Sequence, residues 1–317
     1  MQIQPRNTIL VGDTREQLAR LPGAFVDCVV TSPPFFFQRS YEVEGQIGLE
    51  PSVDAWVIAL AGVFAEVARV LKPTGSVWMD LADTYSQSPR HGPIKSLLLA
   101  PERLLVRLVA DGWLLRNRVV WAKKQRMPSG VLDRLESSYD TVNLLVRSRH
   151  YVFDLDGIRE PLAGEQDAVG RNPGEVWHVE KAKFQGPHFA TFPEALLERP
   201  IRASCPAKVC LACGAPWRTH TTKEYAGRPV RFQRDRFVRR HPVRYRVIRR
   251  HPRLLPTCTC NAGTRPGLVL DPFFGTGTVG AVAERLGRDW LGIDLNPGYC
   301  SMAWERIRGR AIRKGAG

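Results

Sequence analysis

The sequence lacks any apolar run long enough to span a membrane. A transmembrane helix needs roughly 18–20 consecutive apolar residues, and no segment of the 317-residue chain approaches this length. The first residues, Met1–Arg6, also lack the apolar region of a signal peptide. We therefore expect a cytoplasmic protein that has no membrane partner.

Acidic residues are scarce relative to basic ones. The chain has 31 Asp or Glu residues against 46 Lys or Arg residues, which gives a formal net charge of +15. Most of this excess lies between Cys213 and Cys258, where 13 basic residues accompany only two acidic ones, an excess of 11 positive charges. Such a concentrated charge predicts a surface that binds phosphates.

Cysteines are few and odd in number, which argues against a disulfide framework. Four of the seven form two close pairs, Cys210-x-x-Cys213 and Cys258-x-Cys260. Four thiolates from two hairpins would make a closed tetrahedral site for structural Zn²⁺. Reduced cysteines without a metal are the alternative.

Apolar segments alternate between strand and helix patterns along most of the chain. This alternation predicts an α/β fold with a mostly parallel sheet covered on both faces. The polar stretch 154–192 is interpreted as surface loops. Expected strands are Thr8–Val11, Val26–Val30, Ser76–Asp80, Arg118–Trp121, Val142–Val146, Leu268–Leu270 and Trp290–Ile293; expected helices are Thr14–Arg20, Val53–Leu71, 101–110, Val279–Leu286 and one that starts at Gly298.

A glycine turn follows the expected strand Leu268–Leu270. Asp271-Pro-Phe-Phe-Gly-Thr-Gly-Thr278 combines a strand end, a tight turn and a helix start, whose free N–H groups can face a ligand. Asp294, at the end of the next strand, is placed to bind a ribose. No Gly-x-Gly-x-x-Gly run stands near the start of the chain, where a dinucleotide-binding domain would carry it.

A rigid tetrapeptide follows the expected strand Val26–Val30. Its residues are Ser32, Pro33, Pro34 and Phe35. The prolines fix the backbone and direct the Pro33 carbonyl outward. Ser32 offers a second hydrogen-bond acceptor, and Phe35 offers a ring face on which a base can stack.

Together, Thr31–Phe36 and Asp271–Thr278 resemble the catalytic and S-adenosylmethionine (AdoMet) motifs of the DNA amino-methyltransferases, the DNA N-4/N-6 methylase family. Their order, catalytic first, is that of the circularly permuted β-class. The resemblance implies a doubly wound class-I methyltransferase fold with an inserted zinc-ribbon-like basic module. It divides the chain into a catalytic half (1–204), the insert (205–262) and an AdoMet-binding half (263–317).

The resemblance also implies roles for individual residues. The catalytic residues would be Ser32, Pro33, Pro34 and Phe35, which hold the exocyclic amine of a flipped base. The AdoMet site would comprise Asp13, Thr31, Phe192, Asp271, Phe273, Phe274, Gly275, Thr276, Gly277, Thr278 and Asp294.

The implied reaction is methyl transfer from AdoMet to an exocyclic amine in double-stranded DNA. Serine at the first place of the tetrapeptide favours N4 of cytosine, with N6 of adenine as the alternative. Cytosine-C5 chemistry would need a Pro-Cys nucleophile, and the chain has only Cys205-Pro206, in the reverse order. A homodimer and a cognate restriction endonuclease are partners that the family resemblance allows, in a bacterial, archaeal or phage-encoded protein.

The insert is interpreted as a DNA-binding or target-recognition arm. The expected DNA contacts are Trp121, Lys123, Arg236, Arg239, Arg240, Arg244, Arg246, Arg249 and Arg250. A solvated charged face is the alternative for the insert. For the whole chain, an inactive zinc-ribbon DNA-binding protein, an RNA or protein methyltransferase, and a nicotinamide oxidoreductase remain open.

Overall fold

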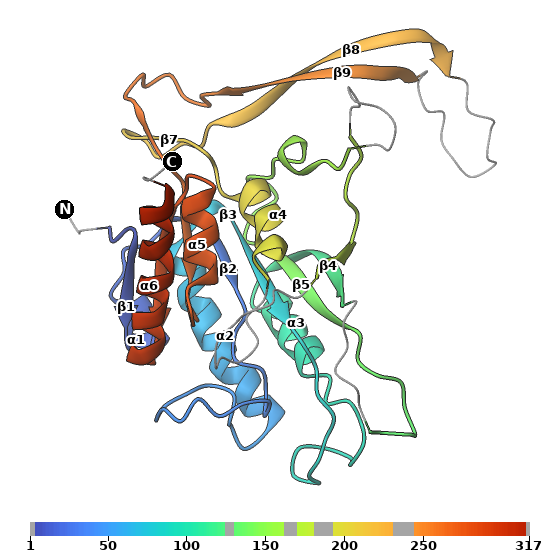
Figure 1. Cartoon of the computed structure of the whole chain (residues 1–317), viewed down its shortest axis with the longest axis vertical. Coiled ribbons are helices and arrows are strands. Elements are labelled where there is room, and N and C mark those ends of the chain that lie inside the picture. The colour runs from blue at the N-terminus through green and yellow to red at the C-terminus, as the bar shows by residue number, and fades with distance from the viewer. Residues whose placement is uncertain (1–3, 124–129, 162–169, 181–192, 231–243, 315–317) are drawn as a thin grey trace.

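The protein is built on one eight-stranded sheet with helices on both faces (Figure 1). The computed structural model describes residues 4–123, 130–161, 170–180, 193–230 and 244–314, of which 223–230, 244–251 and 310–314 are described by their backbone alone. In spatial order the strands are β1 (Thr8–Val11), β12 (Asp289–Asp294), β11 (Leu268–Asp271), β2 (Val26–Thr31), β3 (Leu71–Leu81), β5 (Tyr139–Val146), β4 (Leu114–Ala122) and β6 (Val176–His178).

The first five strands of this order, from β1 to β3, run parallel. Strand β5 is antiparallel to both β3 and β4, and β6 is parallel to β4. The predicted, mostly parallel sheet is therefore confirmed. Because β2 and β11 are neighbours, the catalytic and glycine-turn segments, 240 residues apart, leave the same edge of the sheet.

Each face of the sheet carries its own apolar core and three helices. On one face pack α1 (Thr14–Ala19), α2 (Val53–Val70) and α3 (Ala100–Ala110), and on the other α4 (Glu194–Ser204), α5 (Thr278–Arg285) and α6 (Pro297–Lys314). Trp56 and Phe64 of α2 are almost fully buried in the first core, and Trp290 of β12 in the second. Among the described residues, no helix has the length and apolarity that crossing a membrane would require.

Three elements differ from the sequence-based expectations. Strand β3 begins at Leu71, so Pro73 and Gly75 lie within it, where its pairing with β2 skips from Leu71 to Ser76. Helix α4 was not predicted; it carries Pro200 in its interior, which hides the helical pattern. Strand β6 lies within 154–192, interpreted as loops, because three residues are too few to show a period.

The cysteine- and arginine-rich insert forms a long antiparallel ribbon of β8 (Arg218–Val230) and β9 (Arg244–Leu255) (Figure 1). Its base includes β7 (Val209–Cys210), which pairs with β10 (Thr264–Arg265). This base contacts the amino-terminal edge of the sheet, where Lys72 Nζ donates to Asp27 at 2.6 Å and to the Gly214 carbonyl at 3.4 Å. The ribbon therefore starts from the edge opposite the catalytic tetrapeptide.

Candidate active site

A pocket lies at the carboxyl-terminal edge of the sheet, where β1, β2, β11 and β12 end. It joins the two segments singled out in the sequence, since its lining includes Ser32 and Pro34 from the first and Phe273 and Gly275 from the second. Asp294 closes it from β12. The remaining lining residues are Asp13, Thr14, Tyr41, Val43, Gly45, Gln46, Ile47, Pro272, Leu295, Asn296 and Tyr299.

A buried hydrogen bond joins the two segments directly. Thr31 Oγ1, at the end of β2, donates to Asp271 Oδ1, at the end of β11, at 2.7 Å. The same carboxylate oxygen accepts the Phe273 N–H at 3.1 Å. Burial raises the pKa of Asp271 to about 7, although these two hydrogen bonds oppose the shift. Thr31 and Asp271 thus do not line the pocket; their hydrogen bond holds together the two strand ends from which its lining segments start.

Asp294 holds the glycine turn in place. Its Oδ2 accepts the Gly275 N–H at 2.6 Å, and its Oδ1 accepts the Asn296 N–H at 2.9 Å. Burial raises the pKa of this carboxyl group, and the two backbone donors oppose that rise. An ionised carboxylate has about four acceptor positions, so Asp294 can still accept hydrogen bonds from a hydroxylated ligand in the pocket.

Three other side chains predicted for the cofactor site, Phe274, Thr276 and Thr278, do not line the pocket. The Phe274 ring stacks on Trp290, with centroids 5.3 Å apart, and belongs to the core between sheet and helices. Thr278 Oγ1 accepts from Arg306 at 2.9 Å, and Thr276 accepts from the same guanidinium at 3.4 Å. The Phe274 ring therefore packs in the core and does not line the pocket, and its place in the cofactor site stays a prediction.

The glycines of the turn meet specific backbone and packing demands. Gly277 caps α5 with φ 75°, and a Cβ there would lie 2.7 Å from Ala303. Gly280, which completes a Gly-x-Gly-x-x-Gly spacing that the sequence interpretation did not use, would place a Cβ 2.7 Å from the Phe274 ring. The spacing here serves close packing of α5 against the core, the third-glycine role known in nucleotide-binding turns.

Ser32 is coupled to a buried carboxylate. Its hydroxyl donates to Asp80 Oδ2, at the end of β3, at 3.3 Å. Burial and the neighbouring Asp140 raise the pKa of Asp80 to about 8, while Lys123, which is ion-paired with Asp140, and the Ser32 hydrogen bond oppose the shift. Asp80 Oδ1 is buried without a hydrogen-bond partner in the described structure. Such a perturbed group beside a pocket is a candidate for proton chemistry.

The aromatic residues after Pro34 divide between core and surface. The Pro34 carbonyl accepts the Trp56 indole N–H at 2.9 Å, which anchors the tetrapeptide to α2. Phe35 packs partly buried against the core and does not line the pocket. Phe37, by contrast, is 51% exposed with φ 53°, and its ring centroid lies 4.3 Å from that of His91. This exposed pair was not predicted.

Of the two DNA contacts predicted near the end of β4, Trp121 is buried in the core and Lys123 lies near the pocket. Trp121 is only 4% exposed, and its indole donates to the Val179 carbonyl at 3.0 Å, so its ring packs in the core and its contact with DNA stays a prediction. Lys123 lies over the Trp121 ring at 5.1 Å and pairs with Asp140 beside Asp80, near the pocket. Its contact with DNA stays a prediction.

Two pocket residues were not predicted, Tyr41 from the loop after β2 and Tyr299 from the first turn of α6. Tyr41 and Tyr299 meet edge to face, 6.3 Å between ring centroids, across the pocket. Gln46 braces this loop by accepting the Tyr41 N–H at 2.7 Å. Asp13, which was predicted, lines the pocket and caps α1, and its hydrogen bonds with Arg15 lower its pKa.

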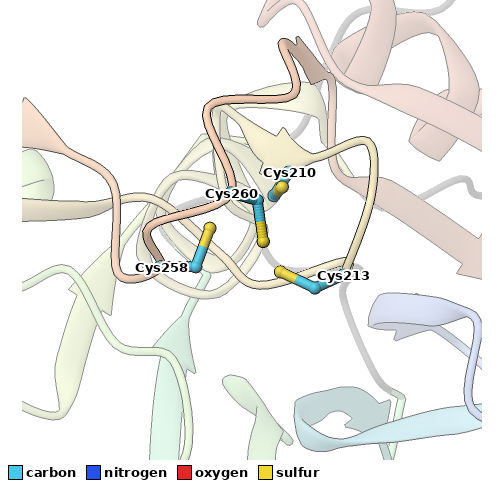
Figure 2. A group of neighbouring side chains, drawn as sticks. All are labelled: Cys210, Cys213, Cys258 and Cys260. Carbon is cyan, nitrogen blue, oxygen red and sulfur yellow. The ribbon is translucent and has the colours of Figure 1, made fainter.

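The four paired cysteines converge at the base of the ribbon. Figure 2 shows their sulfurs turned toward one common centre, and all four Sγ atoms lie within 4.8 Å of one another. Four thiolates around Zn²⁺ at about 2.3 Å would lie about 3.8 Å apart, so the cluster fits with little movement. Hydrogen bonds from the Cys213 N–H, the Ala212 N–H and the neighbouring thiols lower the pKa of the Cys210 thiol to about 6, against the effect of burial. The donor set suits zinc.

Other predicted residues lie outside the described part of the chain. Phe192, Arg236, Arg239 and Arg240 fall there, and Arg244, Arg246, Arg249 and Arg250 belong to β9 with only their backbone described.

Comparison with known proteins decides the family. The family model for DNA methylases acting at N6 or N4 matches residues 26–209 and 250–305. The chain belongs to this DNA methylase family. The family predicted from the tetrapeptide and the glycine turn is therefore confirmed. The Type II methyltransferase M.Cfr9I of Citrobacter freundii is 32% identical over 95% of this chain and 88% of its own length.

Solved structures share the fold of this DNA methylase. The PvuII DNA methyltransferase, described as cytosine-N4-specific, superposes with a TM-score of 0.63 at 20% identity, covering 96% of this chain and 87% of its own. A protein of Thermus thermophilus, described as a DNA modification methylase in complex with S-adenosyl-L-methionine, gives 0.54 at 22% identity, covering 95% and 94%. The class-I methyltransferase fold is confirmed.

We expect Asp271→Asn to stabilise the methylase increasingly as pH rises. The unfolded carboxyl ionises near its ordinary pKa of 3.8, whereas the folded one retains its proton until about 7. The wild-type protein therefore loses stability as pH rises between these values. The asparagine oxygen can still accept from Thr31 and Phe273 without this cost. Urea unfolding at pH 5 and pH 8 measures the difference.

The matched control is Asp133→Asn, at an exposed carboxylate whose pKa Lys95 lowers. This variant should gain no stability between pH 5 and pH 8. An Asp271→Asn variant whose advantage over wild type is the same at both pH values would contradict the buried, proton-retaining carboxyl group.

Proposed function

We propose that this DNA methylase transfers the methyl group of AdoMet to N4 of cytosine in double-stranded DNA. The observation that carries the proposal is the single pocket lined by both Ser32 and Asp294, which belong to the two ends of the chain. The catalytic strand β2 precedes the cofactor strand β11 in the sequence, which supports the permuted β-class order.

The AdoMet end of the pocket is proposed at the ends of β11 and β12. Gly275 and Phe273 would lie against the methionine part, and Asp294 would accept hydrogen bonds from the ribose hydroxyls. The rings of Tyr41 and Tyr299 supply apolar surface for the adenine. AdoMet would supply a methyl group that leaves a positively charged sulfur for the amine nitrogen of the base.

Ser32 and Asp80 are proposed to take the proton that the amine must lose. The nitrogen can donate to Ser32 Oγ, and Ser32 in turn donates to Asp80 Oδ2. As the N–C bond forms, the proton passes from nitrogen to Ser32 and from Ser32 to Asp80. The carboxylate must be ionised to accept it, and Lys123 beside Asp140 favours that form. No covalent bond between base and protein is required.

Cytosine is preferred as the target for two reasons. Serine begins the tetrapeptide, and the PvuII enzyme with the same fold is described as cytosine-N4-specific. Incubation with AdoMet and unmethylated genomic DNA, followed by nucleoside mass spectrometry, should yield N4-methylcytosine. Detection of N6-methyladenine would instead identify adenine as the target base. If the protein binds AdoMet but the DNA contains no methylated nucleoside after incubation, the proposed activity is contradicted.

Asp80→Asn should lower the rate of methyl transfer by roughly 10²–10⁴-fold, the usual contribution of a positioned proton acceptor. AdoMet affinity should change little, because Asp80 does not line the pocket. The wild-type rate should rise with pH through about 8 as Asp80 ionises, and the variant should lose this rise. Single-turnover rates across pH, with AdoMet titrations, measure both.

The comparison variant is Asp294→Ala, which should weaken AdoMet binding before it affects the transfer step. Equal losses of AdoMet affinity and rate in Asp80→Asn would refute the division of roles between the two carboxylates.

The insert is proposed as a separate zinc-bearing, DNA-binding module, residues 205–262, between the catalytic half 1–204 and the AdoMet half 263–317. The break in the family match between 209 and 250 supports this division. Cys210, Cys213, Cys258 and Cys260 would hold one Zn²⁺, which fixes the ribbon base by cross-linking its two ends. Double-stranded DNA is the proposed partner of its arginines.

The purified protein should contain one Zn²⁺ per chain, measured by elemental mass spectrometry. Replacing Cys258 and Cys260 by alanine should abolish it, because two of four ligands are lost. Cys300→Ala, at a buried cysteine outside the cluster, should keep the metal. A zinc content that is the same in both variants would exclude the cluster as the site.

A further inference from the structure

A second cleft lies at the base of the ribbon, on the edge of the sheet opposite the catalytic pocket. Its walls are the 3-10 turn η1 (Asp156–Ile158) with the segment before it, the end of α4, Arg288 just before β12, and residues of β8 and β9 at the ribbon base. Trp217 and Phe153 give it apolar surface, and Arg159, Arg202, Arg218 and Arg288 line it with positive charge.

The two acidic residues in the cleft are already engaged. Asp154 accepts the Thr219 hydroxyl at 2.6 Å and the Gly157 N–H at 3.0 Å. Asp156 is paired with the Arg159 guanidinium at 2.5 Å. These contacts fix the ribbon to the body of the protein. Asp156 offsets the charge of Arg159 and Asp154 offsets part of the charge of Arg288, so the four arginines of the cleft still outnumber its two carboxylates.

Among the described residues, Arg202 and Arg218 have no hydrogen-bond or ion-pair partner. Arg288 is partly buried in the same cleft, where its Nε and Nη1 donate to the Cys205 and Leu286 carbonyls at 3.3 Å and 2.6 Å. Burial lowers the pKa of Arg288 and repulsion from Arg202 adds to this effect, while Cys205 and Asp154 oppose it. The excess of guanidinium groups over carboxylates in this cleft suits an anion.

We propose that this cleft binds backbone phosphates of double-stranded DNA through Arg202, Arg218 and Arg288. The inference deepens the proposed function, since it rests on DNA as the substrate. A duplex fits better than a small anion because the cleft continues into the β8–β9 ribbon, whose insert carries 13 basic and two acidic residues between Cys213 and Cys258. A two-stranded ribbon also matches the width of the DNA major groove.

The contact is separate from the catalytic one. Strand β2 has six residues, and at about 3.3 Å each it sets the two edges of the sheet roughly 20 Å apart. DNA whose base enters the pocket at Ser32 therefore cannot touch Arg218 with the same base pairs. The cleft holds a flanking stretch or a second duplex and adds affinity without reading the methylated base.

The test is the salt dependence of binding of the full-length protein to a duplex of arbitrary sequence, measured by fluorescence anisotropy. Each lost phosphate contact reduces the slope of log affinity against log salt by about 1. Replacing Arg202 and Arg218 by alanine should therefore reduce the slope by about 2. Lysine at both positions should retain most of it, because the charge is kept.

The matched control replaces Arg20 and Arg107 by alanine, which removes two positive charges from the end of α1 and from α3, where they pair with Glu16 and Asp111. Its slope should stay at the wild-type value. Equal slopes for the two alanine variants would overturn the proposal, as would loss of inorganic phosphate binding with unchanged DNA binding. AdoMet titration verifies folding, and nucleoside mass spectrometry of the wild type tests the methylation separately.

Discussion

The hydrogen bond between Thr31 and Asp271 is the contact on which the site depends. It joins the ends of two neighbouring parallel strands, which lead into the tetrapeptide and the glycine turn, 240 residues apart in sequence. Asp271 also accepts the Phe273 N–H, and Asp294 accepts the Gly275 N–H, so two carboxyl groups hold the glycine turn by its backbone N–H groups. Both are stripped of water, which raises their pKa values. The fold tolerates this electrostatic cost because backbone donors and a hydroxyl satisfy the oxygens.

The surroundings of the Asp80 carboxyl group differ from those of Asp271 and Asp294. Its Oδ1 has no partner in the described structure, and Asp140 lies close enough to repel its charge. A carboxylate used only to stabilise the fold would normally be fully hydrogen-bonded. Lys123 lowers the repulsion by pairing with Asp140, so one ion pair controls the proton affinity of the group behind Ser32. Asp271 has hydrogen-bond donors for its carboxyl group and holds the fold together, whereas Asp80 has an oxygen without a partner and is suited to proton transfer.

The sequence predicted the mostly parallel sheet because buried parallel strands leave continuous apolar runs. It also predicted the cysteine cluster, since ligand spacing is local. It failed where side-chain direction depends on tertiary packing. Phe274 and Trp121 belong to motif segments, yet both rings point into cores. Tyr41, from a loop, and Tyr299, from the first turn of α6, line the pocket although no motif marks them. Helix α4 was hidden by Pro200, whose lost hydrogen bond is offset by a buried apolar face.

The net charge of the insert does not predict at which edge of the sheet it lies. Composition marked it as a phosphate-binding element, but only the topology reveals that Lys72 and Asp27 hold its base at the amino-terminal edge of the sheet. Loops at the carboxyl-terminal edge must converge on one reacting base, and their shape is constrained by that chemistry. An insertion at the opposite edge is free of this constraint. It can lengthen and accumulate arginines without disturbing the pocket, which explains why the most basic element of the chain starts from the edge opposite Ser32.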